Sequence, residues 1–440
     1  GATSYSISNG LTKIVAIANS LLVLTSLTPY AYGVTELALS VVGVFSIFQL
    51  TGLERTVVAD MGVEKGQGDV PAARRLFQDF IILLTLLSVV AWAVLFWGSV
   101  TIGRFFTEEI GSYFVIISFL FLAAPATAAM RILYGVYFDF TTTAYFTFLQ
   151  EIAKLTFLAF FFFFDSVTIA IVLWAYVIAM CAPVLFLMPR TMGHLRRLRL
   201  EPARGKSEPL RFFRGHNLWT LLSNYIDTSI KSIRLWLIKF FIGTEAVALF
   251  AVATGFVGHL SSFINISSIV GPVLPQYIHN RPIFYRIIDK TIKYQMLLAF
   301  VVVAAGLLVV PILVEWLFPQ YQSSLVLFAI LVFALFPSSI NNIFQTMFYA
   351  LKAQRNLFFA QVVKFIFVVG LGAASFYFVG FFGIAIEYLS TVTFFGLERY
   401  RVLKKLYPDF SINTRDFFLY DEYDKLLIQR ILNRFIGIRR

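Results

Sequence analysis

Four polar side chains fall on one stripe of an otherwise apolar stretch at residues 218–242, LWTLLSNYIDTSIKSIRLWLIKFFI. They are Asn224, Asp227, Lys231 and Arg234, and at about 100° per residue they share one face of a helix. Lys231 lies about 15 Å from the nearer end of the stretch, too deep for its ammonium group to reach an interface. Ionised groups at that depth are costly in lipid, so we expect the stripe to line a protein interior or an aqueous cavity. Lysine and arginine placed there can bind phosphate.

Other apolar stretches also contain charged or amide side chains, and several lie at matched depths in the two halves of the chain. The candidate substrate-binding residues are Lys231, Arg234, Lys364, Lys154, Arg131, Asn224 and Asn341. The candidate ion-coupling residues are Asp227, Glu151 and Glu387, because a carboxylate inside a membrane span is by default a candidate for an ion or proton pathway.

Local pairing is the alternative interpretation of these residues. Asp227 and Lys231 are four residues apart and can neutralise each other on one helix, and Glu151 and Lys154 have the same option at a spacing of three. Even then, Arg234 would leave the stripe net positive, unless its side chain reaches the nearby outer interface. Lys364 has no acid three or four residues away, which favours an unpaired cavity role for it. Arg131 lies near the basic end of its stretch, where snorkelling to the interface is favoured.

Composition places the chain among polytopic membrane proteins. Of its 440 residues, 59% are hydrophobic and 14% are charged, and the mean hydropathy is +0.80. The net charge of +12 falls mostly in loops on one side, so the positive-inside rule explains it and no nucleic-acid partner is expected. A single cysteine and four scattered histidines exclude disulfides and a thiolate cluster, so we expect no metal and no cofactor. The sequence also lacks a G-x-x-x-x-G-K-[ST] phosphate-binding loop.

Hydropathy predicts twelve membrane spans of the length that a bilayer core requires. They are expected at 11–31, 34–53, 77–101, 112–138, 143–164, 166–188, 218–242, 246–272, 294–314, 323–350, 356–379 and 381–397. Basic residues gather in the loops 54–75, 189–217, 273–293 and 351–355, whereas the intervening turns are poor in them. Both termini are therefore expected in the cytoplasm.

An internal repeat divides the chain into halves. With a shift of about 210 residues, Glu151 falls on Gln361 and Lys154 on Lys364. Six spans per half give both halves the same orientation, which predicts parallel repeats about an axis along the membrane normal. The predicted fold is all-α and membrane-integral, with two six-helix lobes around a central cavity. We expect an N-terminal lobe at 1–188, a basic cytoplasmic linker at 189–217, a C-terminal lobe at 218–397 and a cytoplasmic tail at 398–440 that contains an amphipathic helix.

Three stretches resemble a known family. They begin with TPYAYG and TGLERTVVADMGVEKGQGDVPAARRLF, continue with FFIGTEAVALFAVATGFVGHLSSF and VLPQY, and end with EWLFPQYQSSLVLFAILVFALFPSSINNIFQTMFYALKAQRN. Together they are similar to the polysaccharide-transporter branch, of the O-antigen flippase type, in the multidrug/oligosaccharidyl-lipid/polysaccharide exporter superfamily. The resemblance extends to about residue 397. Pro319 stands where the family usually has a glycine.

The resemblance implies two six-helix lobes with alternating access and a cationic cavity. It implies a flippase, not an enzyme, that moves undecaprenyl-diphosphate-linked oligosaccharides from the cytoplasmic to the outer leaflet of the bacterial inner membrane. A proton or sodium gradient would drive this movement. The expected partners are the polyprenyl-diphosphate oligosaccharide, membrane lipids, and glycan-assembly proteins such as a polysaccharide polymerase.

Three other functions remain as alternatives. A multidrug exporter of the superfamily typically has acidic ion-binding residues in its N-terminal lobe, often in the first span, and the first span here has none. A lipid II flippase usually has two further spans. A membrane-embedded glycan-transferring enzyme would need a large outer loop, and the predicted outer turns are short.

Overall fold

The computed structural model describes residues 2–106, 108–199, 208–264, 266, 270, 274–277, 280–351, 353–410 and 424–425. Within these residues the secondary structure is helical and contains no strand. Nine stretches of them are long and apolar enough to cross a membrane, and 354–406 holds two helices. With the helices at 2–26 and 215–241, the described residues make the twelve predicted passes.

The N-terminal lobe contains seven α-helices that make six passes, because the second pass is divided by the short 3-10 helix η1 (Phe45–Gln49). Its helices are α1 (Ala2–Ser26), α2 (Pro29–Val44), α3 (Leu53–Gly66), α4 (Val70–Phe106), α5 (Glu108–Val136), α6 (Phe140–Phe162) and α7 (Ile169–Arg199).

The C-terminal lobe repeats this order after the 3-10 helix η2 (Pro209–Phe213). Its α-helices are α8 (Gly215–Phe241), α9 (Thr244–Phe263), α11 (Arg281–Leu317), α12 (Ser324–Leu331), α13 (Leu335–Ala350), α14 (Gln354–Val379) and α15 (Gly383–Leu406). Short 3-10 helices connect them, namely η3 (Leu274–Tyr277), η4 (Pro319–Tyr321), η5 (Val332–Ala334) and η6 (Gly380–Phe382).

Local sequence signals explain where several helices begin. The Thr28 side chain accepts a hydrogen bond from the Ala31 amide, and Pro29 occupies the first position of α2, where its missing N–H costs nothing. Asp139 caps α6 in the same way through the amide of Thr142. The sharp turn between α8 and α9 places Gly243 at φ 134°, a conformation that side chains disfavour.

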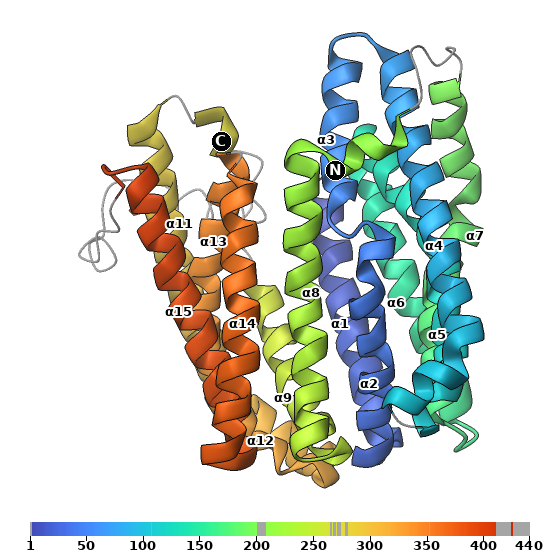
Figure 1. The fold of residues 1–440 in the computed structure, drawn as a ribbon, viewed down its shortest axis with the longest axis vertical. Helices are drawn as coiled ribbons and strands as arrows, with labels where there is room; N and C mark the ends of the chain where they lie inside the picture. The colour runs from blue at the N-terminus through green and yellow to red at the C-terminus, as the bar shows by residue number, and fades with distance from the viewer. Residues whose placement is uncertain are drawn as a thin grey trace.

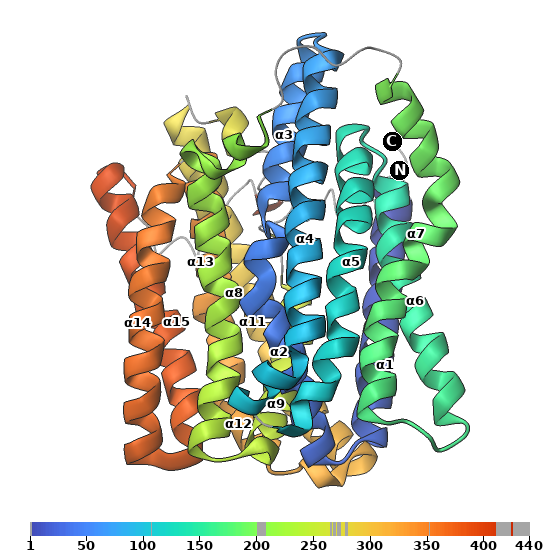
Figure 2. The same ribbon diagram turned by 45° about the vertical axis from the view of Figure 1, so that its right-hand side comes forward.

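Two segments predicted as basic loops, 54–75 and 273–293, are largely helical instead. Helix α3 continues to Gly66, α4 starts at Val70, and α11 starts at Arg281. Helices α4 and α11 each have 37 residues, about 55 Å, whereas a bilayer core is about 30 Å thick. Their charged ends therefore extend into water as helices. Figure 2 shows α3 and α4 rising beyond their neighbours at this end, which we call the basic end.

The two lobes have the same internal packing. Helix α1 packs against α6 in the first lobe, and their repeat counterparts α8 and α14 pack against each other in the second. Figure 1 shows α11, α13, α14 and α15 on one side, α4 to α7 on the other, and α8, α1 and α2 between them. The structure therefore has the two-lobed, twelve-pass fold that the repeat predicts.

Helix α2 joins the lobes by packing against both α8 and α9. A Cβ atom on Gly33 would lie 2.2 Å from the backbone oxygen of Thr244, and one on Gly43 would lie 2.1 Å from Ser232 Oγ. A residue without a side chain is thus required at Gly33, where the obstacle is backbone, whereas the Ser232 hydroxyl beside Gly43 can move.

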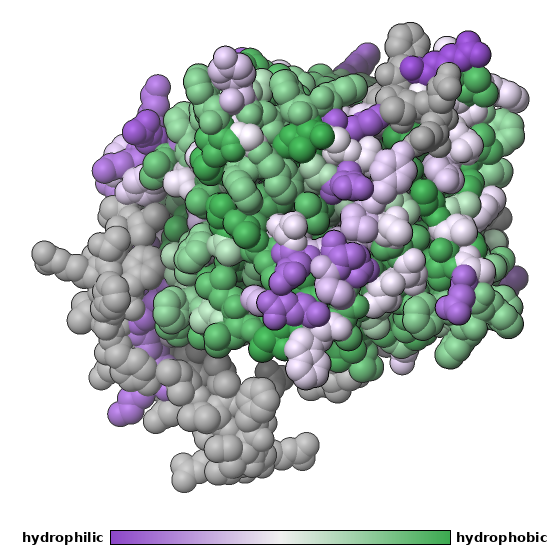
Figure 3. All heavy atoms as spheres, turned by 90° about the horizontal axis from the view of Figure 1, so that it is seen from below, coloured by the Kyte–Doolittle hydropathy of each residue, from purple (hydrophilic) through white to green (hydrophobic). Residues whose placement is uncertain are grey.

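The end opposite the basic end is held shut by contacts between lobes, and we call it the closed end. The Tyr321 hydroxyl donates to the carbonyl of Leu27 at 2.9 Å, and the Gln320 amide donates to that of Leu24 at 3.1 Å. Figure 3 shows this face as mainly hydrophobic, with hydrophilic residues gathered near its middle. Of the amphipathic helix predicted in the tail, only residues 424 and 425 are among the described residues.

Candidate functional site

Asp227 is the centre of a charged cluster between α8 and α14. Its Oδ1 accepts hydrogen bonds from Lys364 Nζ at 2.8 Å and from Gln361 Nε2 at 3.3 Å, and its Oδ2 lies 3.6 Å from Lys231 Nζ. Arg399 of α15 is close enough to interact with it electrostatically. The cluster therefore contains three cationic side chains and one carboxylate.

The expectation that Lys364 is unpaired is wrong. Its sequence neighbours contain no acid at helical spacing, but its partner comes from another helix, and the side chain keeps only 19% of its exposure. The local pairing of Asp227 with Lys231 is present as well, so this carboxylate has two lysine partners.

The stripe on α8 changes from exposed to buried along its length. The Lys231 side chain is 73% exposed although it lies near the middle of the membrane span, so we expect an aqueous space there. The Arg234 side chain, one turn closer to the closed end, is 5% exposed. At this position the guanidinium of Arg234 meets the Glu387 carboxylate and the Tyr388 ring of α15.

Arg234 and Glu387 form a buried ion pair. The guanidinium donates to the two carboxylate oxygens at 2.8 and 3.0 Å, and Thr391 Oγ1 donates to the same carboxylate at 2.7 Å. The expectations that Arg234 adds free positive charge to the stripe, or reaches the outer interface, are therefore wrong. Glu387, which is 0% exposed, has its oxygens engaged by these donors.

The two candidate asparagines are engaged in helix contacts. The Asn224 amide donates to the carbonyl of Thr220 at 2.9 Å, and its side chain fills the space beside Gly52, where an added Cβ would lie 2.1 Å from Nδ2. The Asn341 amide donates to the carbonyl of Val392 at 2.8 Å and joins α13 to α15.

A second polar cluster lies in the N-terminal lobe. Asn19 of α1 is fully buried and donates to the Glu151 carboxylate at 2.9 Å. The Lys154 ammonium lies 3.6 Å from the centre of the Tyr176 ring. In each lobe an acid and an amide face each other across the equivalent pair of helices, but their places are exchanged. Glu151 lies on α6 and faces Asn19 of α1, whereas Asp227 lies on α8, the counterpart of α1, and faces Gln361 of α14.

Sequence reasoning missed two residues beside these clusters. Glu36 of α2 interacts electrostatically with Lys154, and it was visible as an acid inside the predicted span 34–53. Arg399 is 7% exposed and donates to the carbonyl of Asn341 at 3.2 Å. It was not visible because hydropathy ended the last span at 397, whereas α15 continues to Leu406.

The predicted cations are therefore not gathered in one place. Lys231 and Lys364 are together, Lys154 belongs to the second cluster, and Arg234 is paired elsewhere. Arg131 lies near the basic end, 2.9 Å from Glu54 of α3, with 43% of its side chain exposed.

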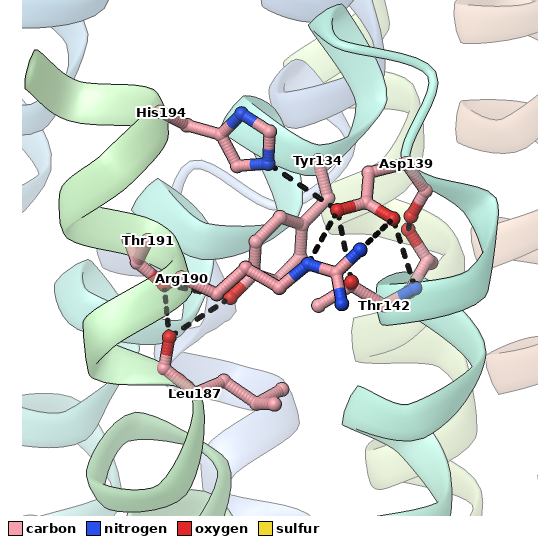
Figure 4. A network of polar contacts seen from close by, with 8 residues as sticks. Tyr134, Asp139, Thr142, Leu187, Arg190, Thr191 and His194 are labelled. Carbon is pink, nitrogen blue, oxygen red and sulfur yellow. Dashed lines mark hydrogen bonds and ion pairs between the residues drawn. The ribbon is translucent and has the colours of Figure 1, made fainter. Parts of the chain in front are cut away.

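A separate polar network lies at the basic end of the first lobe, around Asp139 (Figure 4). Arg190 Nε lies 3.0 Å and His194 Nε2 lies 3.3 Å from its carboxylate. Burial alone would raise the pKa of Asp139, but hydrogen bonds from the Thr142 side chain and amide and from His194, with the charge of Arg190, lower it below its usual value. The network fixes the junction of α5, α6 and α7.

An apolar cavity of about 250 Å³ lies at the junction of the lobes, lined by α1, α2, α9 and α11. Leu21, Phe256 and Val309 are typical of its lining. His259 contributes a polar edge, and its Nε2 lies 3.1 Å from Ser20 Oγ on the facing lobe. The described residues contain no group of three or more His, Cys, Asp or Glu side chains that could hold a metal ion.

Comparison with known proteins identifies the fold. Neither a family model nor a curated protein sequence matches the chain. Among solved structures, an inward-facing multidrug resistance transporter of the MATE family and MOP superfamily matches with a TM-score of 0.69 and 13% identity, covering 91% of this chain and 96% of that one. The lipid II flippase MurJ, in an inward closed conformation, matches with a TM-score of 0.67 and 11% identity over 98% and 96% of the two chains.

A third match is a MOP superfamily transporter from Pyrococcus furiosus, described as having a binding pocket of reversed polarity. Its TM-score is 0.65 and its identity 13%, over 92% of this chain and 94% of that one. The chain thus has the twelve-helix, two-lobe fold of these transporters. The match to MurJ spans nearly all of that chain, so a difference in length does not separate the present protein from it.

Proposed function

We propose that the protein is a flippase that moves a polyprenyl-diphosphate-linked oligosaccharide from the cytoplasmic to the outer leaflet of a bacterial inner membrane by alternating access. The observation that carries this proposal is the exposed ammonium group of Lys231 at mid-span, next to Lys364 and Arg399. Three cations around one carboxylate attract an anionic headgroup and repel a cationic drug. The oligosaccharide crosses the membrane without chemical conversion.

The two parts of such a lipid have different requirements. Its diphosphate and sugars need an aqueous, positively charged space, because they lose their hydrogen-bond partners in hydrocarbon. Its long chain needs an apolar path, and the cavity between α1, α9 and α11 supplies one at the junction of the lobes. Lys13 of α1 donates to the carbonyl of Ser262 at 2.8 Å, near the last residue of α9. In this proposal the headgroup enters from that end of α9.

The orientation follows from charge. The basic end would face the cytoplasm under the positive-inside rule, so the closed end would face outward. The protein would then be in a state that receives its substrate from the inner leaflet. Asp227 is the candidate coupling carboxylate, because proton uptake by Asp227 would release two lysines for the diphosphate.

Reconstituted protein tests the proposal. We expect Lys231→Gln and Lys364→Gln to slow translocation of a polyprenyl-diphosphate oligosaccharide by at least about tenfold, since a charge-assisted contact contributes about 1.5–3 kcal/mol. Lys239→Gln, on the last turn of the same helix, is the matched control and should transport normally. If the two cluster variants fold and transport at the wild-type rate, the cationic-site mechanism is wrong.

A cation-coupled multidrug exporter is the second candidate, and Glu36 and Glu151 favour it because they place carboxylates in the N-terminal lobe. Export of a cationic dye that is lost in both Glu36→Gln and Glu151→Gln, without any translocation of the lipid-linked sugar, would support that function instead. A lipid II flippase would use the same headgroup chemistry, so parallel assays with lipid II and with an oligosaccharide-linked lipid distinguish the two.

A further inference from the structure

Three side chains of α11 converge on one carboxylate near the basic end. Lys290 Nζ lies 3.0 and 3.1 Å from the two carboxylate oxygens of Asp424, and Lys293 Nζ lies 2.6 Å from one of them. The Tyr294 hydroxyl donates to the other. Asp424 belongs to the tail, more than a hundred residues along the chain from these donors.

This group is buried, unlike an ion pair on the surface. The side chain of Asp424 is 1% exposed, and those of Lys290 and Lys293 are 13% and 14% exposed. Ammonium groups removed from water in this way require an anion, and the cost of losing it is far larger than for an exposed pair. Converging ammonium and hydroxyl donors also match a phosphate group, which presents more oxygens than a carboxylate.

The position of these donors on α11 connects them to the apolar cavity. At about 100° per residue, Tyr294 and Ala305 lie within roughly 20° of each other on the helix, and Val309 follows one turn later. The rise from Tyr294 to Ala305 is about 17 Å. Ala305 and Val309 both line the cavity of about 250 Å³ between the lobes. A phosphate bound at the α11 donors would therefore have an apolar path along the same side of the helix.

We propose that Lys290, Lys293 and Tyr294 form a binding site for the phosphate headgroup of a polyprenyl-type lipid, and that the tail carboxylate of Asp424 occupies this site as a tethered competitor. The lipid chain lies along α11 toward the apolar cavity. The tail therefore lowers the affinity of the site until a lipid displaces Asp424. This site is distinct from the Asp227 cluster, and its occupancy is measured as binding, independently of any transport.

The whole 440-residue chain in phosphatidylcholine nanodiscs, titrated with farnesyl diphosphate, tests the site. We expect Asp424→Asn to bind about tenfold tighter than wild type, since a tethered competitor acts at roughly millimolar effective concentration. Asp409→Asn is the matched control, because Asp409 is a 75% exposed partner of Arg281 near the same helix end. The double variant Lys290→Gln/Lys293→Gln should bind at least about tenfold more weakly than wild type.

A second measurement keeps the test independent of how the variants fold. A fluorophore on Lys425→Cys, in a Cys181→Ser background, reports the position of the tail in a chain that retains the site. Farnesyl diphosphate should change its fluorescence, and the same concentration of inorganic pyrophosphate should have at most a weak effect because it lacks the chain.

The outcomes are distinct. Unchanged affinity in Asp424→Asn, or in the lysine double variant, overturns the site. Equal responses to pyrophosphate and farnesyl diphosphate overturn the lipid assignment and identify a site for soluble phosphate. An unchanged tail signal at saturating farnesyl diphosphate overturns the competition between tail and lipid.

Discussion

At the scale of single residues, the Arg234–Glu387 pair joins α8 to α15 and leaves no charge free for a ligand. Removing one partner should strand the other in a buried position. We therefore expect Arg234→Met and Glu387→Leu, each alone, to destabilise the protein by about 3–5 kcal/mol. The double variant should recover most of this loss, because two apolar side chains can fill the same space. Thermal unfolding of the four proteins in one detergent measures the effect.

If the loss of stability in the double variant equals the sum of the losses in the two single variants, this interpretation is contradicted. The pair would then contribute through packing of each side chain alone. Thr391→Val provides a milder control, because it removes only the hydroxyl that donates to Glu387. It should cost about 1 kcal/mol.

Asp139 predicts a dependence of stability on pH. Its folded pKa is lowered from the ordinary value of 3.8, so the ionised carboxylate stabilises the folded protein at pH values above this, and the contribution is lost as the pH falls through the folded pKa. The stability difference between wild type and Asp139→Asn should shrink below about pH 4. Melting temperatures measured across this range provide the test.

The control for this prediction is another capping aspartate. Asp69 caps α4 by accepting from the Ala72 amide at 3.0 Å, but from an exposed position. Asp69→Asn should therefore leave a smaller difference from wild type at neutral pH. A difference between wild type and Asp139→Asn that persists unchanged to pH 3 would show that its charge is not what stabilises the α5–α6 junction.

The sequence predicted the charged stripe on α8 but not its partners, for a physical reason. The pair Asp227–Lys231 is local and follows from helical spacing. The Lys364 contact joins residues 137 positions apart, and helix packing rather than local pattern decides it. The same holds for Glu387, whose role as the partner of Arg234 depends on where α15 crosses α8. The sequence therefore showed which charged side chains lie inside the spans. It did not show which of the cations have an acidic partner on another helix.

At the scale of helices, the contacts of α2 with α8 and α9 differ in their tolerance for side chains. Gly33→Ala would place a Cβ against the rigid backbone oxygen of Thr244, while Gly43→Ala would meet only the movable hydroxyl of Ser232. We expect Gly33→Ala to lower the melting temperature clearly and Gly43→Ala to lower it less, because overpacking costs about 1–3 kcal/mol. Gly258→Ala on α9 has no atom within 4 Å of the new Cβ and should be neutral or slightly stabilising. Equal melting temperatures for Gly33→Ala and Gly258→Ala would contradict this contact.

The helices themselves were largely predictable, because long apolar stretches have few alternatives in a membrane. All twelve passes were expected near their observed positions. The errors occurred at the basic end, where α3, α4 and α11 continue beyond the apolar segment. Hydropathy detects the apolar segments that can lie in lipid. It does not detect a charged segment that is helical in water.

At the scale of the whole molecule, contacts at the closed end hold the two lobes together on one side of the membrane. Two hydrogen bonds cross it, from Tyr321 to the Leu27 carbonyl and from Gln320 to the Leu24 carbonyl. They join η4 of the second lobe to the end of α1 in the first. In an alternating-access cycle these bonds must break when the closed end opens, so they bias the protein toward the state described here.

Removing both donors should therefore shift the conformational equilibrium. Each lost hydrogen bond costs about 1 kcal/mol, which is about a fivefold change in population, so Tyr321→Phe with Gln320→Ala should favour opening by up to about thirtyfold. Spin labels at the exposed positions Thr25 and Gln322 should show a longer distance across the closed end, and labels at Val63 and Ile283 a shorter one at the basic end. Tyr377→Phe, which removes the hydroxyl of an 84% exposed tyrosine near the same end, is the control. Opening at the closed end without closure at the basic end would mean that the lobes do not move as rigid units.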